Sequence, residues 1–91
     1  MASKFQTKTI KRLKAKGWKV LKIIRLNESG YPDLLALRNG EAIWIECKEA
    51  NDTLKPLQKF RMTELNELGF LAFLEQDGKP SELDDYFKSE K

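Results

Sequence analysis

The stretch that decides the predicted fold covers residues 32–48 and reads PDLLALRNGEAIWIECK. Two apolar runs flank Asn39-Gly40, a pair that favours a two-residue type I′ hairpin because both positions need a positive φ. Such a turn fixes the register of the two strands and sets Asp33 opposite Glu46. Both faces of the hairpin carry apolar residues, which predicts a sheet covered on its two sides.

Three residues with chemical potential meet at the open end of this hairpin. Lys48 lies two residues beyond Glu46, so the pleat returns its side chain to the face of Glu46 and Asp33. Two opposed carboxylates repel each other, and a divalent cation would turn them into a ligand pair. The backbone carbonyl of Cys47 is a further candidate ligand, and Lys48 would orient water or neutralise developing charge. The alternative is a simple ion pair of Lys48 with Glu46 or Asp33, without metal.

The rest of the chain supplies helices and two more strands around the hairpin. Periodicity and capping residues predict helices over 3–16 and 56–68 and a final helix that opens at Ser81; strands are expected over 18–26, 33–38, 41–48 and 70–75. In the 56–68 helix, Leu57, Phe60, Leu65 and Leu68 are expected to share a face. The order is α-β-β-β-α-β-α in a single domain of residues 1–91, an α/β (α+β) fold.

The composition excludes several kinds of chemistry. The chain has no histidine, which rules out a Ser–His triad and histidine acid–base catalysis, and its one cysteine, Cys47, cannot form an internal disulfide. No apolar run has the length of a membrane span. We therefore expect a reducing, cytoplasmic location with no membrane partner.

Charge is distributed unevenly along the chain. Residues 1–25 contain nine basic side chains and no acid, whereas residues 26–91 contain eight basic and fourteen acidic ones. A basic segment of this kind predicts a polyanionic partner, with nucleic acid as the first candidate, although a solvated helix face is an equal alternative. The candidate DNA contacts are Lys4, Lys8, Lys11, Arg12, Lys14, Lys22, Tyr31 and Lys55. Tyr31 is at least as well explained by loop packing, and Lys55 by a solvated position.

The motifs resemble those of a known nuclease superfamily. Pro32-Asp33, followed after twelve residues by Glu46-Cys47-Lys48, is similar to the PD-(D/E)xK pattern. The wider pattern of residues 30–33, 45–48 and Leu57-Gln58, with a helix that ends at Gly69, resembles a stand-alone VRR-NUC domain. This resemblance covers about residues 5–74. It implies a restriction-endonuclease-like core with a mixed sheet flanked by helices.

The resemblance also implies a mechanism and a partner. Asp33 and Glu46 would bind Mg²⁺ or Mn²⁺, Lys48 would be the catalytic lysine, and Gln58 would stand near the active site. Small members of the family are similar to Holliday-junction resolvases and act as homodimers. One feature departs from the family pattern: members often carry a glutamate at the start of the first helix, where residues 1–6 of this chain read MASKFQ. The metal ligand set is therefore open at that point.

The sequence thus predicts a Mg²⁺-dependent, structure-specific DNA endonuclease that hydrolyses phosphodiester bonds, in branched DNA, as a homodimer. The open alternatives are a less specific nickase, flap nuclease or exonuclease, and a non-catalytic or weakly active DNA-binding module on a nuclease scaffold. A structural protein in which Asp33, Glu46 and Lys48 only form ion pairs is a third possibility, and the basic N-terminal segment argues against it.

Overall fold

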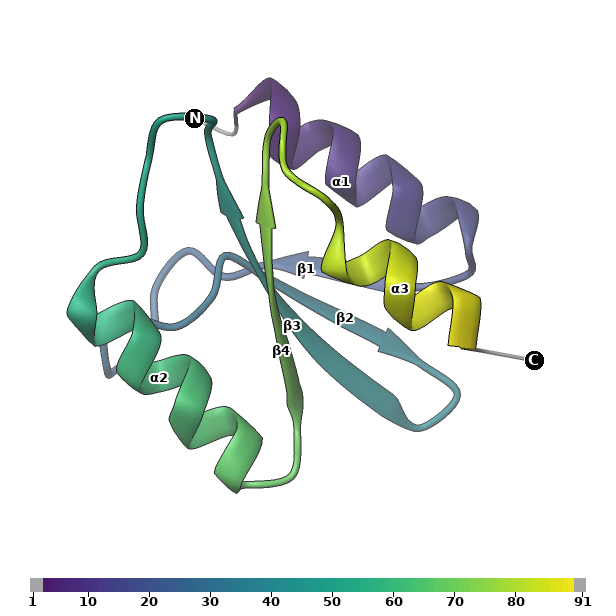
Figure 1. The fold of residues 1–91 in the computed structure, drawn as a ribbon. Helices are drawn as coiled ribbons and strands as arrows, with labels where there is room; N and C mark the ends of the chain where they lie inside the picture. Colours follow the sequence, from purple (N-terminus) through teal and green to yellow (C-terminus); the bar gives the residue numbers. More distant parts are fainter. Residues whose placement is uncertain (1–2, 90–91) are drawn as a thin grey trace.

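A computed structural model describes residues 3–89 of the chain. Four strands form one sheet in the order β1-β2-β3-β4, and three helices pack around it (Figure 1). The elements are α1 (Lys4–Ala15), β1 (Lys19–Lys22), β2 (Leu34–Arg38), β3 (Glu41–Lys48), α2 (Pro56–Glu67), β4 (Leu71–Gln76) and α3 (Glu82–Ser89). This order confirms the predicted α-β-β-β-α-β-α arrangement.

The central hairpin has the predicted turn and register. Asn39 and Gly40 both have positive φ, 48° and 79°, as a type I′ turn requires. The β2–β3 ladder is antiparallel and runs from the Arg38–Glu41 pair to the Leu34–Ile45 pair. β3 pairs with β4 in parallel, so the sheet is mixed, as expected.

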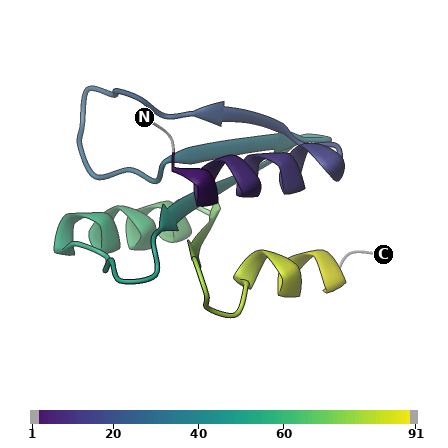
Figure 2. The ribbon, with the colours of Figure 1, turned by 90° about the horizontal axis from the view of Figure 1, so that it is seen from above.

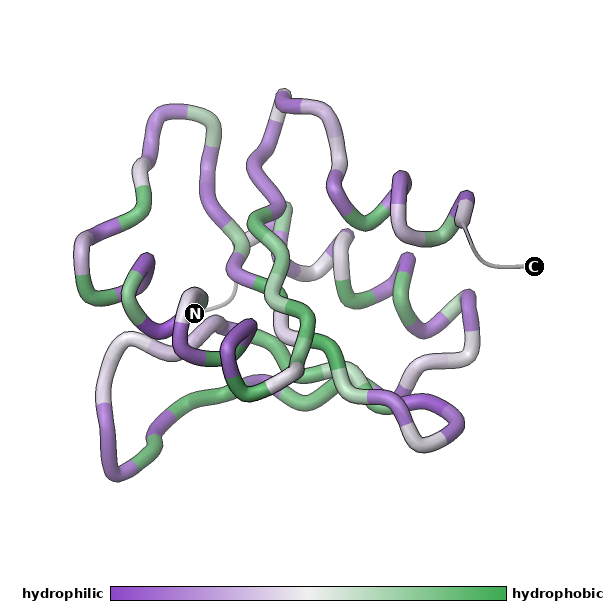
Figure 3. Tube along the Cα trace, turned by 60° about the horizontal axis from the view of Figure 1, so that its bottom comes forward, coloured by the Kyte–Doolittle hydropathy of each residue, from purple (hydrophilic) through white to green (hydrophobic). Residues whose placement is uncertain are grey.

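The two faces of the sheet are covered by different helices. α1 and α3 lie together on one side and α2 lies on the other (Figures 1 and 2). The core lies under α1 and α3 and joins side chains of both helices to alternate residues of β2 and β3; its members are Leu13, Trp18, Leu34, Ala36, Ile43, Ile45 and Leu83. Apolar residues accordingly concentrate along the strands (Figure 3).

The strand predicted over residues 18–26 is wrong beyond Lys22. Lys22 pairs with Leu34, the first residue of β2, and only one further hydrogen bond continues the pairing, from Ile23 N–H to the Asp33 carbonyl at 2.7 Å. The partner chain turns away at Pro32, which has no N–H to donate. Residues 24–26 therefore leave the sheet, and the Ile24 side chain is 87% exposed.

The predicted apolar face of the 56–68 helix is not the face that packs on the sheet. Leu65 is buried, but Leu57, Phe60 and Leu68 are 45%, 57% and 67% exposed. On a helix, Leu65 is turned about 80° from Leu57, so α2 meets the sheet with its flank. The stripe of Leu57, Phe60 and Leu68 is left open.

Within residues 3–89, no helix is both long enough and apolar enough to cross a membrane.

Candidate active site

Asp33 lies at the start of β2, where the hairpin meets the loop before it. Its main-chain oxygen accepts the Ile23 N–H, which ties the residue to the end of β1. Its carboxylate Oδ2 accepts the backbone N–H of Cys47 at 3.2 Å. The side chain is therefore held across the hairpin against β3, close enough to Glu46 for the two carboxylates to repel each other.

Glu46 and Lys48 share one face of β3. Glu46 is 2% exposed and Lys48 is 6% exposed, a degree of burial that is rare for charged residues. Lys48 Nζ lies 3.6 Å from Glu46 Oε2. The structure thus brings Asp33, Glu46 and Lys48 together at one end of the hairpin, as the turn register predicts.

Gln58 connects α2 to this cluster. Pro56 opens the helix, and Gln58 in the first turn accepts the Lys55 N–H through Oε1 at 2.9 Å. This capping bond fixes the amide so that Nε2 donates to Glu46 Oε2 at 3.3 Å. The glutamine therefore reaches the site, while Lys55 itself is exposed at the helix start.

The electrostatics of Glu46 are unusual for a carboxylate. Burial and the neighbouring charge of Asp33 raise the pKa of Glu46 to about 7, and Lys48 only partly offsets these two effects. Glu46 Oε1 is buried and has no hydrogen-bond partner among the described residues. A buried acceptor without a partner costs stability, so Glu46 destabilises the fold when the site holds no cation.

This donor set fits a divalent cation of the magnesium type. A cation would satisfy Glu46 Oε1 and remove the repulsion between Glu46 and Asp33. Magnesium takes one or two carboxylates and completes its shell with water and substrate phosphate. Among residues 3–89, no group of three or more His, Cys, Asp or Glu side chains is arranged to hold a metal.

Cys47 points away from the cluster, because it alternates with Glu46 and Lys48 along β3. It lies on the α1 side of the sheet, packed against the core, and burial raises the pKa of the thiol to about 12. The thiol is therefore a packing group and not a thiolate nucleophile. A role for the Cys47 carbonyl as a metal ligand stays a prediction.

The predicted DNA contacts fall into two groups. Six of them are exposed and free to reach a solvent-side ligand: Lys4, Lys8, Lys11, Lys14, Lys22 and Lys55. Of these, Lys4, Lys8 and Lys11 line one hollow along α1 together with Thr7. Arg12 is half-buried and instead forms ion pairs with the buried Glu75 and the exposed Asp84.

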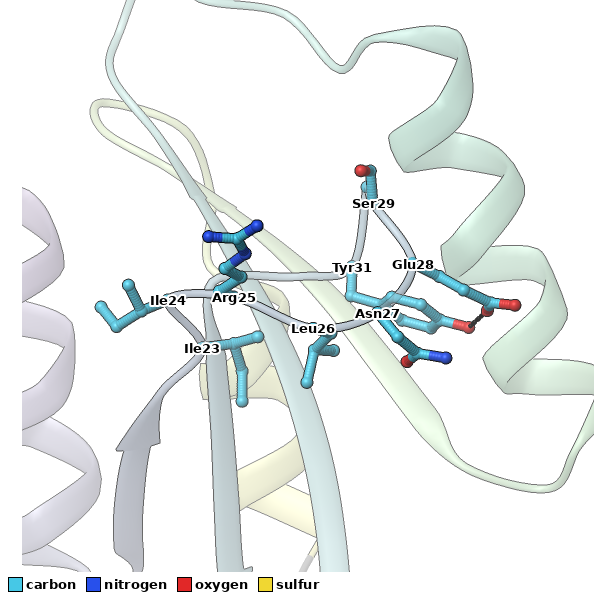
Figure 4. A pocket seen from close by; sticks show the side chains of 9 residues that line it. Ile23, Ile24, Arg25, Leu26, Asn27, Glu28, Ser29 and Tyr31 are labelled. Carbon is cyan, nitrogen blue, oxygen red and sulfur yellow. Dashed lines mark hydrogen bonds between the residues drawn. The ribbon is translucent and has the colours of Figure 1, made fainter.

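Tyr31 is also engaged with protein groups. Its hydroxyl shares one hydrogen between carboxylate oxygens of Glu28 and Glu64, each 2.9 Å away. Its ring packs against Trp44 and under the Arg61 guanidinium. The loop that carries it, residues 23–31, lines a cavity of about 440 Å³ (Figure 4). The packing interpretation of Tyr31 is thus the one that its contacts favour.

Two residues of the site environment were missed by sequence reasoning. Asp52 places a carboxylate 3.5 Å from Lys48 Nζ, and Gln76 hydrogen-bonds the turn that carries Asp52. In the sequence, Asp52 is marked only as an acid four residues after Lys48. Glu49 lies in the same polar connector and is an equally good candidate partner for Lys48 on that basis.

A comparison with protein families matches residues 3–81 to the family described as archaeal Holliday junction resolvase (Hjc). The chain belongs to this family. A solved VRR_NUC domain has a TM-score of 0.78 and 26% sequence identity, with 96% of this chain and 94% of that chain covered. Hjc from Archaeoglobus fulgidus, described as a Holliday junction resolvase from an archaeal hyperthermophile, has a TM-score of 0.62 and 17% identity, with 86% and 71% covered.

The curated protein sequences contain no match. Membership of the Hjc family confirms the resemblance to small PD-(D/E)xK nucleases. The two solved structures confirm the mixed-sheet nuclease fold. A nuclease is the class of function that these comparisons support.

Proposed function

We propose that this chain is a divalent-metal-dependent, structure-specific DNA endonuclease that cuts branched DNA. The observation that carries the proposal is the buried Glu46 carboxylate, whose Oε1 has no partner among the described residues while Asp33 and Lys48 lie beside it. Lys48 pairs with Glu46 Oε2, so this ion pair gives Oε1 no partner, whereas a bound cation would give it one. The substrate class rests on membership of the Hjc family.

Each residue has a defined part in the proposed mechanism. Asp33 and Glu46 would hold Mg²⁺ or Mn²⁺, which when bound would supply Lewis-acid stabilisation of the scissile phosphate and would make water more acidic. Lys48 holds a positive charge where negative charge develops on the phosphate oxygens. Gln58 orients Glu46 through Nε2. Exposed lysines of α1 contact phosphates and position the duplex without reading its sequence.

The proposed active form is a homodimer. Leu57, Phe60 and Leu68 form an open apolar stripe on α2, and a second copy of the chain is the occupant that buries it. A dimer sets two active sites against two strands of a junction. Sedimentation equilibrium should give twice the monomer mass for wild type. The Phe60→Lys variant should have the mass of one monomer. Wild type that is monomeric at micromolar concentration would contradict the proposed dimer.

The decisive experiment uses three labelled substrates: a four-way junction, a flap and a linear duplex. Each is incubated with wild type, Asp33→Asn, Lys48→Ala and, as a control, the exposed Lys88→Ala, in Mg²⁺ or in EDTA. We expect junction cutting that needs metal, that Lys88→Ala keeps and that both site variants lose by roughly 10²-fold or more. Binding without cutting in Mg²⁺ and Mn²⁺ would favour a non-catalytic DNA-binding module instead. If the flap or the duplex is cut faster than the junction, the proposed preference for branched DNA is wrong.

A further inference from the structure

The ammonium of Lys48 lies between two carboxylates. Glu46 Oε2 is 3.6 Å from Nζ, and Asp52 Oδ2 is 3.5 Å from it. Glu46 comes from the same strand, but Asp52 comes from the connector between β3 and α2. The Lys48 side chain is 7% exposed, whereas that of Asp52 is 54% exposed. Asp52 therefore closes the solvent side of an otherwise buried lysine.

The connector that carries Asp52 is fixed by hydrogen bonds. Asp52 Oδ1 accepts the Thr53 N–H at 2.8 Å, which orients the carboxylate. Gln76 Nε2 donates to the carbonyls of Glu49, Ala50 and Asp52. Gln76 is the β4 partner of Lys48 in the parallel ladder. The strand next to Lys48 thus determines where the connector places Asp52.

The two carboxylates that hold Lys48 are not equivalent. Glu46 Oε2 also accepts from Gln58, and Glu46 belongs to the proposed cation pair. A cation bound to Glu46 would partly neutralise its carboxylate and would weaken the attraction between Glu46 and Lys48. Asp52 is not one of the proposed cation ligands, so its attraction for Lys48 would persist when the cation binds.

We propose that Asp52 is a positioning residue that holds the Lys48 ammonium in place, with Gln76 setting Asp52 through the 49–52 turn. This inference rests on the function proposed above. A lysine has four rotatable side-chain bonds, and an ammonium that wanders by about 1 Å loses much of its effect on a transition state. The simpler alternative is an exposed ion pair at a spacing of four residues, which contributes little.

Single-turnover cleavage of a four-way junction in Mg²⁺ separates these alternatives. We expect Asp52→Asn to lower the rate about tenfold, with the junction Kd in Ca²⁺ unchanged within about twofold. Asp52→Glu should restore part of the rate, because it keeps the charge. Gln76→Ala should also lower the rate, because it removes the hydrogen bonds that hold the 49–52 turn. Asp77→Asn removes an exposed acid from the turn that directly follows β4 and should leave the rate unchanged.

A second readout does not use activity. In the metal-free protein, reductive methylation followed by mass spectrometry measures how accessible each lysine is. Lys48 should react several-fold faster in Asp52→Asn and Gln76→Ala than in wild type, with Lys88 as the internal reference.

The outcomes are distinct. If wild type cuts the junction but Asp52→Asn cuts equally fast, the positioning role is wrong and the proposed function stands. Unchanged methylation of Lys48 in Asp52→Asn also overturns the role. If wild type does not cut at all, the proposed function fails and takes the inference with it.

Discussion

Gln58 Nε2 donates a hydrogen bond to Glu46 Oε2 across 3.3 Å, from the first turn of α2 to the buried face of β3. The same amide accepts the Lys55 N–H through Oε1 and so caps its own helix. One side chain therefore sets both the start of α2 and the orientation of the most buried carboxylate of the site.

Gln58→Ala should weaken divalent metal binding. The variant loses the group that orients Glu46, and partners of this kind are worth roughly 10–100-fold in metal affinity. Mn²⁺ titration followed by electron paramagnetic resonance measures the change. Asn66→Ala, at an exposed position on the same helix, should bind Mn²⁺ as wild type does. Equal affinities for the two variants would show that Gln58 is only a helix cap.

Glu46→Gln should stabilise the metal-free protein at alkaline pH. The pKa of Glu46 is raised to about 7 in the folded chain, so the fold binds this proton more tightly than the unfolded chain does. The stability that the proton contributes is complete below the ordinary glutamate pKa and is lost as the pH rises through about 7. At pH 8 in EDTA the variant should therefore be more stable than wild type by roughly 2–3 kcal/mol.

Urea unfolding at pH 4.5 and pH 8 measures this difference. The two proteins should differ little at pH 4.5, where Glu46 is protonated. Added Mg²⁺ at pH 8 should stabilise wild type more than Glu46→Gln, because the variant lacks one of the two proposed carboxylate ligands. A variant that is less stable than wild type at pH 8 in EDTA would contradict the raised pKa.

Gly30→Ala should destabilise the fold through a clash with α2. Gly30 has a φ of +90°, and a Cβ there would lie 2.6 Å from Leu57 Cγ. Backbone strain and overpacking together should cost roughly 2–4 kcal/mol. Thermal unfolding measures the loss.

Gly78→Ala is the matched control for this clash. Gly78 has a φ of +80° and nothing within 4 Å of its added Cβ, so only the backbone strain of roughly 1–2 kcal/mol applies. Adding Leu57→Ala to Gly30→Ala should recover part of the stability. Equal losses for the two glycine variants would show that the contact with Leu57 does not matter.

Arg12→Met should lower the stability of the fold by weakening the contacts between α1, β4 and α3. Arg12 Nη1 lies 3.4 Å from Glu75 Oε1, and the Glu75 carboxylate is 1% exposed. Without the arginine, the donors to Glu75 within residues 3–89 are the Ser81 hydroxyl and the Leu83 N–H. We expect a loss of roughly 1–3 kcal/mol in urea unfolding.

Lys14→Met provides the comparison, since Lys14 is exposed on the same helix and should change stability by less than about 0.5 kcal/mol. Junction binding is measured beside stability. An Arg12→Met variant that unfolds like wild type but binds DNA more weakly would return Arg12 to the set of DNA contacts.

Local sequence was enough where one short-range rule controlled the outcome. The Asn39-Gly40 turn permits only one tight register, which the β2–β3 ladder follows as far as the Leu34–Ile45 pair. Asp33, one residue before β2, then reaches β3 by accepting the Cys47 N–H. Helix starts at Ser3 and Pro56 likewise follow from side chains within one turn. These rules act over a few residues, so the sequence displays them directly.

Tertiary structure decided whatever depended on a partner far along the chain. β1 stops at Lys22 because β2 offers no further backbone to pair with, although residues 23–26 have strand-like composition. The open stripe on α2 reflects which flank of the helix meets the sheet. The placement of Asp52 against Lys48 depends on Gln76, and the burial of Glu75 depends on Arg12. The sequence by itself therefore predicted the hairpin and placed Asp33, Glu46 and Lys48 at its open end. Contacts between distant segments account for the burial of Glu46 and Lys48, for the raised pKa of Glu46 and for the side chains packed around them.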